Sequence, residues 1–135
     1  MMNSTENTAQ PSGTLCIQTI AMPRDTNPNG DIFGGWLVSQ MDLAGAIMAR
    51  RLAGGRVTTV AIDRMNFHLP VVVGDLVSCY ATLTGQGRTS MHIAVEVWAG
   101  REELDGMKRV TEANFVFVAI DEQGRPRALA PAGEN

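Results

Sequence analysis

The chain has 135 residues, of which 44% are hydrophobic and 19% charged, and its formal net charge is −3. This length and balance are typical of one globular domain with its own core. The negative charge excludes a chain-wide basic surface for nucleic acid, and no uncharged apolar run reaches the roughly 18 residues of a membrane span. We therefore expect no nucleic-acid partner and no membrane span, and a cytoplasmic location follows by default.

The two ends of the chain are polar and read as extensions of the domain. Residues 1–13 are rich in Ser, Thr and Asn and lack the basic start and apolar centre of a signal peptide, so we expect a disordered leader. The domain is predicted over residues 14–129, and residues 130–135 are predicted to form a flexible tail. Cys16 and Cys79 lie far apart without a metal-binding spacing, which predicts buried, reduced thiols and no metal site.

The first half of the domain predicts one strand and one helix. Residues 15–22 form a short apolar run, and the following segment, 24–31, is dense in turn formers. The apolar stretch from Trp36 to Leu52 is long enough for about four helical turns. Gly54-Gly55 then stops the helix, after two arginines have placed positive charge in its last turn.

The second half predicts strands separated by turns. Strands are expected over 57–67, 76–84, 88–98 and 108–120, with turns at 85–87 and 100–106. One strand, one helix and four strands give an α+β fold, and the short late turns favour antiparallel pairing. The strands are apolar on both alternating faces, and one helix cannot cover both. The sequence therefore predicts an oligomer, and a dimer first of all.

Asp42 is the only acid in the otherwise uncharged stretch from Trp36 to Ala49. Burial of a carboxylate is costly unless a neighbouring group compensates it. Helical spacing gives its face small residues: Gly35, Val38, Ser39, Gly45, Ala46 and Ala49. The opposite face carries a core stripe of Leu37, Met41, Ala44, Ile47 and Met48. Asp42 is then either a chemical group that a slender ligand can reach, or a structural acid bonded to a loop or a partner subunit.

Gly34-Gly35 lies at the expected start of the same helix. The first N–H groups of a helix have no intrahelical partner, and glycine lets a ligand approach them closely. Such a helix end can polarise a carbonyl whose oxygen becomes negative during attack. Together with Asp42, about two turns away, it describes an acyl-transfer site in which the carboxylate acts as general base or nucleophile.

The segment Ala21–Ile47 closely resembles the signature of hot-dog-fold acyl-CoA thioesterases of the YciA type. Shorter matches lie at 55–61, 74–75, 87–90, 96–98, 111–113 and 121–127, so that the resemblance covers roughly residues 15–129. It is most specific over residues 29–42. The resemblance implies a hot-dog fold, in which a curved antiparallel sheet wraps around one long central helix.

The resemblance also implies an activity, the hydrolysis of acyl-CoA to free fatty acid and CoA, with no cofactor other than the CoA of the substrate. Asp42 falls on the catalytic acid of the family, and Asp31 falls where related thioesterases place a second polar residue. Two protomers would join their sheets, with Gly35 of one chain near Asp42 of the other. Three such dimers commonly form a hexamer.

CoA carries a 3′-phosphate and a diphosphate, so we expect arginines along its path. The predicted CoA-binding residues are Arg56, Val57, Thr58, Arg88, Thr89, Ser90 and Arg127. Arg88 is the strongest of these candidates, because its glycine and hydroxyl neighbours could also contact phosphate or pantetheine.

Two other functions share this fold, a non-catalytic acyl-CoA sensor and a hydratase or dehydratase. Binding alone does not need an acid in the middle of the helix, which disfavours the sensor. Hot-dog hydratases usually pair an Asp with a His, and neither His68 nor His92 follows the glycine-rich loop. A Ser-His-Asp triad is also unsupported, because no His lies near Ser39 in the sequence.

Overall fold

The computed structural model describes residues 10–101 and 106–130 of the chain. The strands are β1 (Thr14–Ile20), β2 (Val57–Phe67), β3 (Leu76–Gln86), β4 (Ser90–Gly100) and β5 (Lys108–Ala119), and the helices are a short 3-10 helix, η1 (Pro23–Asp25), and α2 (Gly34–Ala53). The predicted order of one strand, a long helix and four strands is confirmed. Most of the predicted leader and tail, and the middle of the loop after β4, lie outside the described residues.

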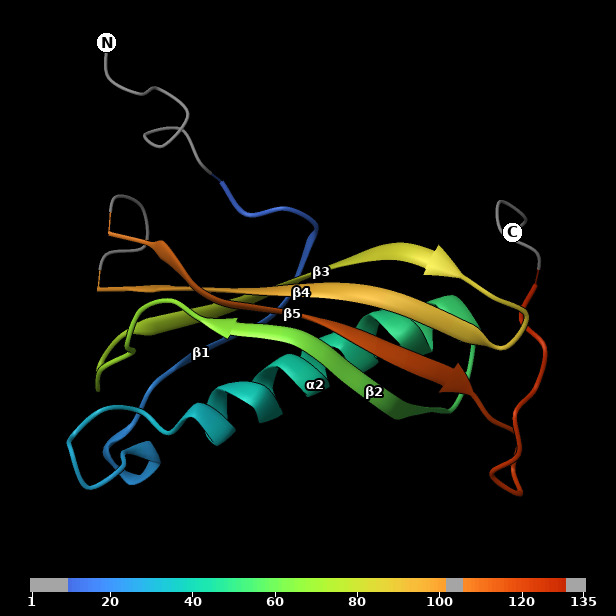
Figure 1. Ribbon diagram of the computed structural model, residues 1–135, viewed down its shortest axis with the longest axis horizontal. Coiled ribbons are helices and arrows are strands. Elements are labelled where there is room, and N and C mark those ends of the chain that lie inside the picture. Colours follow the sequence, from blue (N-terminus) through green and yellow to red (C-terminus); the bar gives the residue numbers. More distant parts are fainter. Residues whose placement is uncertain (1–9, 102–105, 131–135) are drawn as a thin grey trace, which may run out of the picture.

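The five strands form one antiparallel sheet in the order β1-β3-β4-β5-β2. Helix α2 contacts all five strands and crosses them obliquely on one face of the sheet (Figure 1). The α+β class and the antiparallel pairing are therefore confirmed. β1 and β2 form the two edges of the sheet, although they are the first two strands of the chain.

The core fills the space between α2 and the sheet. Along β4, Met91, Ile93, Val95 and Val97 are fully buried, which is the period-2 alternation of a strand with one face on the core. Opposite them, Gly45 of α2 lies so close to the sheet that a Cβ there would stand 2.8 Å from Cε1 of Phe117. The glycine therefore lets the helix backbone pack directly against an aromatic ring.

The ends of α2 have different chemistry. At its C-terminus Gly54 adopts the left-handed conformation (φ 70°), and its N–H donates to Arg50 O at 2.8 Å. This confirms the predicted stop. At its N-terminus the capping residue is Phe33, which offers no side-chain cap. Asp31 is therefore not a helix cap.

Two strand ends differ from the prediction. β3 continues through the expected turn to Gln86, and β4 begins at Ser90 instead of residue 88. Gly87 N–H donates to Ser90 O at 2.9 Å, so the tight turn lies two residues later in the chain than expected. Glycine at position 85 does not end β3, because the register shifts there and the pairing with β4 resumes.

The two cysteines lie in different surroundings. Cys79 is fully buried in β3, and burial raises the pKa of its thiol to about 12, which confirms the prediction of an inert core thiol. Cys16 is half-buried in the edge strand β1, at a shift in register between Leu15 and Ile17. The prediction of burial is wrong for Cys16, because a bulged edge strand has less cover.

Edge strand β2 exposes apolar side chains, with exposed fractions of 54% for Val60, 42% for Ile62 and 52% for Phe67. Its pairing with β5 shifts register twice, and Arg64, in the second shift, has φ 54°. The outer edge of a strand also presents unpaired N–H and C=O groups. An apolar, unpaired edge of this kind is the surface at which a second protomer is expected.

Candidate active site

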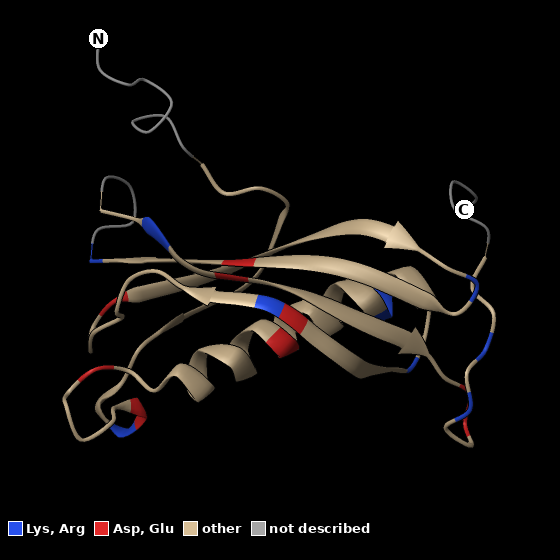
Figure 2. Ribbon diagram, in the orientation of Figure 1, with Lys and Arg blue, Asp and Glu red and all other residues tan. Residues whose placement is uncertain are grey.

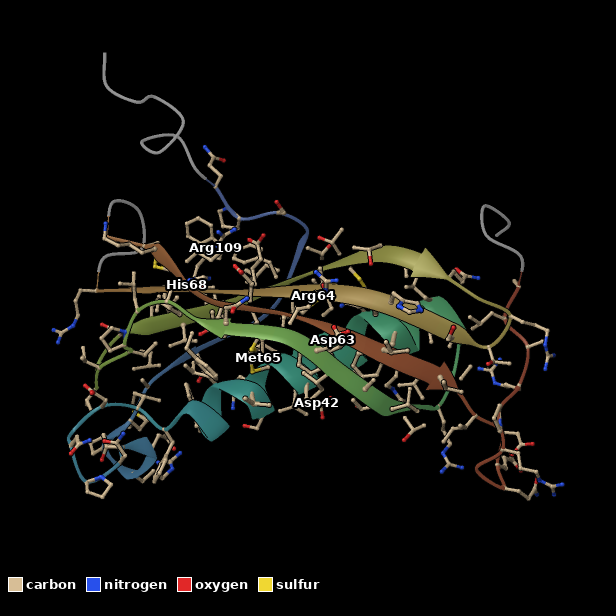
Figure 3. All side chains as sticks on the ribbon, in the orientation of Figure 1. Asp42, Asp63, Arg64, Met65, His68 and Arg109 are labelled. Carbon is tan, nitrogen blue, oxygen red and sulfur yellow. The ribbon has the colours of Figure 1, made fainter. Side chains whose placement is uncertain are left out.

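Asp42 is half-buried on α2 and is anchored to the neighbouring edge strand. The hydroxyl of Thr59 in β2 donates to Asp42 Oδ1 at 2.6 Å. Oδ2 accepts no hydrogen bond from any residue in the described part of the chain. The carboxylate therefore has one oxygen held by the protein and one that can meet a ligand or a partner (Figure 3).

The helix face around Asp42 is smaller than predicted. Gly35 and Ser39 are exposed on it, but Gly45 and Ala49 are buried beneath the sheet. At Gly45 the reason is that Phe117 of β5 and Val95 of β4 pack against the helix. Ile47 and Met48, expected in the core stripe, are only half-buried. The open part of this face is thus limited to the first half of α2.

The start of α2 offers two free amides. Trp36 N–H and Leu37 N–H donate to Phe33 O at 3.1 and 3.3 Å. The N–H groups of Gly34 and Gly35 have no acceptor among residues 10–101 and 106–130. No atom lies within 4 Å of the position that a Cβ on Gly35 would take. This helix end can therefore receive a carbonyl oxygen at two unshielded donors.

A single chain does not bring these two parts together. Asp42 and Gly35 are seven residues apart, which is about 10 Å along a helix axis. A carboxylate that acts on a carbonyl must stand within about 3 to 3.5 Å of the reacting atoms. The arrangement is consistent with the expectation that each half of the site completes that of another protomer.

Asp31 lies in the exposed loop before α2. Its N–H and that of Asn29 donate to Asn27 Oδ1, at 3.1 and 2.9 Å, which fixes the loop. Asp31 lines a hollow of about 350 Å³, here called the helix-start hollow, whose walls are Asn27, Asp31, Ile32, Gly34, Leu37 and residues 67–71. The structure thus brings Asp31 and Gly34 to the same hollow.

The predicted CoA-binding residues lie at the other end of the molecule, near the C-terminus of α2. Backbone hydrogen bonds join their segments, from Ala119 N–H to Thr89 O (3.0 Å) and from Leu129 N–H to Arg88 O (2.8 Å). Figure 2 shows positively charged residues gathered at this end. Asp31 and the helix start lie at the opposite end, so that within one chain the two groups of predicted residues are not brought together.

The arginines of this group differ in their contacts. The Arg127 guanidinium donates to Ala53 O at 2.7 Å and so neutralises the last turn of α2. Arg56 donates to the carbonyls of Asp121 and Glu122, both at 3.2 Å. Arg88 is exposed, and among the described residues its side chain makes no hydrogen bond or ion pair. Arg88 is therefore the arginine most available to a phosphate.

The profile of the Thioesterase superfamily matches residues 29–105, which is more than half of the chain. The chain belongs to the thioesterase superfamily. This thioesterase is 51% identical over 131 residues to acyl-CoA thioester hydrolase YciA of Escherichia coli (strain K12), and the match covers 95% of this chain and 98% of the relative.

Two solved structures have the same fold. The hexameric thioesterase y2039 from Yersinia pestis is 52% identical with a TM-score of 0.85, over 90% of this chain and 99% of the other. The hexameric hotdog fold thioesterase Cj0915 of Campylobacter jejuni is 42% identical with a TM-score of 0.82, over 87% of this chain and 91% of the other. The predicted family and the hot-dog fold of this thioesterase are confirmed.

The prediction from sequence missed one residue of the candidate site, Thr59, whose hydroxyl contacts Asp42. The chain was expected to contact CoA at Val57 and Thr58, but the nearest contact to Asp42 comes from the next residue along β2. The alternation of side chains along the strand was the available signal, because it separates Thr58 from Thr59. Of the two, Thr59 is the half-buried one.

A second hollow, of about 590 Å³, lies on the sheet face away from α2, and its walls include Glu96, Arg109 and Glu112. His68 Nε2 lies 3.1 Å from Glu112 Oε2, and Arg109 Nε lies 3.1 Å from Glu112 Oε1 (Figure 3). His68 therefore contacts a carboxylate that also pairs with Arg109.

In the part of the thioesterase that the structure describes, no helix is long and apolar enough to cross a membrane. Within the same residues, no three His, Cys, Asp or Glu side chains are grouped so that they could hold a metal ion.

Proposed function

We propose that this thioesterase hydrolyses the thioester of fatty acyl-CoA to a free acid and CoA. Asp42 acts as general base or nucleophile, and the Gly34 and Gly35 amides polarise the thioester carbonyl. The observation that carries the proposal is the half-buried Asp42 carboxylate, with Oδ1 held by Thr59 and Oδ2 unoccupied by any described residue. A relative named acyl-CoA thioester hydrolase, 51% identical over nearly the whole chain, favours hydrolysis over a sensor or a hydratase.

The geometry supports two routes to the same products. As a base, Asp42 takes a proton from water while the water oxygen bonds to the carbonyl carbon, and the C–S bond then breaks as the CoA thiolate leaves and is protonated. As a nucleophile, Asp42 bonds to the carbonyl carbon, the C–S bond breaks, and the CoA thiolate leaves and is protonated; water then hydrolyses the mixed anhydride to the free acid and the Asp42 carboxylate. In both routes the carbonyl oxygen becomes negative, and the two free amides of the α2 start stabilise it.

The proposed site is shared by two chains. Asp42 of one protomer meets the Gly35 helix start of the partner, because within one chain these groups are about 10 Å apart along the helix. Apolar edge strand β2 is the proposed seam, and three such dimers form a hexamer. The hexameric state of the similar thioesterase y2039 supports this number of chains. Asp31 positions water or substrate at the helix start.

We further propose that the segments around Arg56, Arg88 and Arg127 bind the CoA nucleotide. Arg88 is the principal phosphate contact, because its guanidinium is exposed and free of other described partners. Val57, Thr58, Thr89 and Ser90 lie beside these arginines and line the path of the pantetheine. The reaction needs no cofactor other than the CoA of its substrate, and its proposed location is the cytoplasm.

Replacement of the carboxylate tests the proposal. In Asp42→Asn we expect kcat/KM for acyl-CoA to fall by about 10² to 10⁴, because neither proton abstraction nor attack is open to the amide. CoA affinity by titration calorimetry and the Tm should stay close to those of the parent. Glu96→Gln, on the sheet face away from α2 and outside the proposed seam, is the matched control and should keep full activity. Unchanged kcat/KM in Asp42→Asn would remove Asp42 from the chemistry.

A further inference from the structure

The helix-start hollow combines largely apolar walls with one acidic side chain. Most of its walls are apolar, namely Ile32, Leu37, Phe67, Leu69, Pro70 and Val71. Its polar lining residues are Asn27, Asp31 and His68, and no Lys or Arg lines it. The hollow therefore offers apolar surface to a hydrocarbon chain but no permanent cation to a phosphate.

The hollow also adjoins the start of α2, because Gly34, which carries one of the two free amides, is part of its wall. A thioester carbonyl that is bound at Gly34 and Gly35 has two substituents, the acyl chain and the sulfur of CoA. The nucleotide of CoA needs cations, and no Lys or Arg lines the hollow, whereas Arg56, Arg88 and Arg127 lie together at the opposite end of each chain. Of the two substituents, the acyl chain is the one whose chemistry matches the hollow.

We propose that the acyl chain of the substrate enters the helix-start hollow, and that the Phe67 ring sets the longest chain that fits. This second proposal rests on the proposed acyl-CoA hydrolysis, and it adds which part of the site receives the acyl chain of the substrate. The hollow measures about 350 Å³, near the lower limit of about 300 Å³ for small-molecule pockets, so it holds an acyl chain and not a whole CoA.

Phe67 is placed to act as the limiting wall. Its ring atoms Cε1 and Cζ lie 3.5 Å from the position that a Cβ on Gly34 would take, so the ring stands beside the amide that receives the carbonyl. The side chain is 52% exposed in a single chain, at the end of the strand proposed as the seam, so its removal widens the hollow without emptying the core of the protomer. Light scattering must therefore show that Phe67→Ala keeps the parental oligomer. Leu69, which is 43% exposed, forms a neighbouring wall that a larger side chain would narrow.

The test compares acetyl-, hexanoyl- and dodecanoyl-CoA as substrates of the full chain. For Phe67→Ala we expect the ratio of kcat/KM for dodecanoyl-CoA to that for acetyl-CoA to rise by about tenfold, since a few methylenes in an apolar pocket have this effect. For Leu69→Trp the same ratio should fall. Phe33→Ala is the matched control, because Phe33 is 49% exposed beside the same helix start but does not line the hollow.

Three results would overturn the proposal while leaving the hydrolysis intact. An equal change in kcat/KM for all three substrates would place CoA, not the acyl chain, in the hollow. An unchanged ratio in both Phe67→Ala and Leu69→Trp would remove the hollow from the substrate path. A shift in Phe33→Ala as large as that in Phe67→Ala would show a general effect of the helix start. Failure of the proposed function is distinct, since the parent would then hydrolyse none of the three.

Discussion

The hydrogen bond from Thr59 to Asp42 joins the helix to the edge strand at a single pair of atoms, 2.6 Å apart. A carboxylate that accepts such a bond has one fixed orientation, so that its second oxygen points to a constant place. Hydrogen bonds to charged groups contribute about 1.5 to 3 kcal/mol, which is enough to hold this orientation against thermal rotation. Thr59 is therefore a positioning residue for Asp42.

For Thr59→Val we expect kcat to fall by roughly tenfold to a hundredfold, the rate equivalent of losing a hydrogen bond to a charged group. KM should change little, because Thr59 holds the carboxylate and not the substrate. Steady-state kinetics with one acyl-CoA measure both quantities.

The control for this variant is Thr59→Ser, which keeps the hydroxyl and should recover most of the lost kcat. A Thr59→Val enzyme with parental kcat, or a Thr59→Ser enzyme as slow as Thr59→Val, would contradict the positioning role.

At the scale of single residues, the sequence identified Asp42 but not Thr59, and this difference has a physical reason. Asp42 could be singled out because its charge is unusual within an apolar helix. Thr59 could not, because threonine is ordinary in a strand and its contact with Asp42 spans 17 positions of the chain. The burial of Gly45 was missed for a similar reason, since helical spacing defines a face but not which part of that face a strand covers.

At the scale of the elements, Gly45 allows α2 to lie close to β5. Phe117 is fully buried and stacks with Phe115 at a centroid separation of 6.1 Å, so its ring has little room to move. Gly45→Ala should therefore destabilise the protein by about 1 to 3 kcal/mol through overpacking. Urea unfolding measures this as a lower midpoint at constant slope.

Gly35→Ala in the same helix is the matched comparison for Gly45→Ala. No atom lies within 4 Å of its added methyl group, so we expect no loss of stability or a small gain from helix propensity. If Gly45→Ala were as stable as Gly35→Ala, the close contact with Phe117 would not limit the packing.

Most elements could be predicted because their signals are local. Period-2 alternation defined β4, and a glycine pair defined the end of α2, where Gly54 has φ 70°. The end of β3 was predicted too early, because glycine is a common turn residue. Pairing with β4 instead continues the strand past Gly85. Strand order was also not readable, since it depends on contacts between distant segments.

At the scale of the whole molecule, the shared site can be tested by mixing two inactive variants. Asp42→Asn lacks the carboxylate, and Gly35→Pro lacks one amide donor at a position in the first turn, where proline is tolerated. Random exchange of dimers gives half heterodimers, each with one intact site of two, so the mixture should regain about a quarter of the parental activity, measured after unfolding and refolding together.

Each variant refolded alone is the control for this mixture and should stay inactive. A mixture that also stays inactive, although light scattering shows mixed dimers, would mean that each chain carries its own complete site. The sequence predicts a dimer, because its apolar residues exceed what one helix can cover. The position of the partner protomer could not be predicted, since no local sequence signal fixes the register in which two edge strands pair.

The strand order has a further consequence for the order of events during synthesis. Within one chain β2 pairs only with β5, so Val57 must pair with Ala119 before the strand that carries Thr59 is in place. At about 5 to 20 residues per second, several seconds pass between the emergence of β2 and that of β5. During this interval α2 can form and the apolar residues of β2 have no strand to join. The carboxylate of Asp42 therefore gains its hydrogen-bond partner only near the end of translation, and nascent chains that stop before β5 lack both the anchored acid and the seam for a second chain.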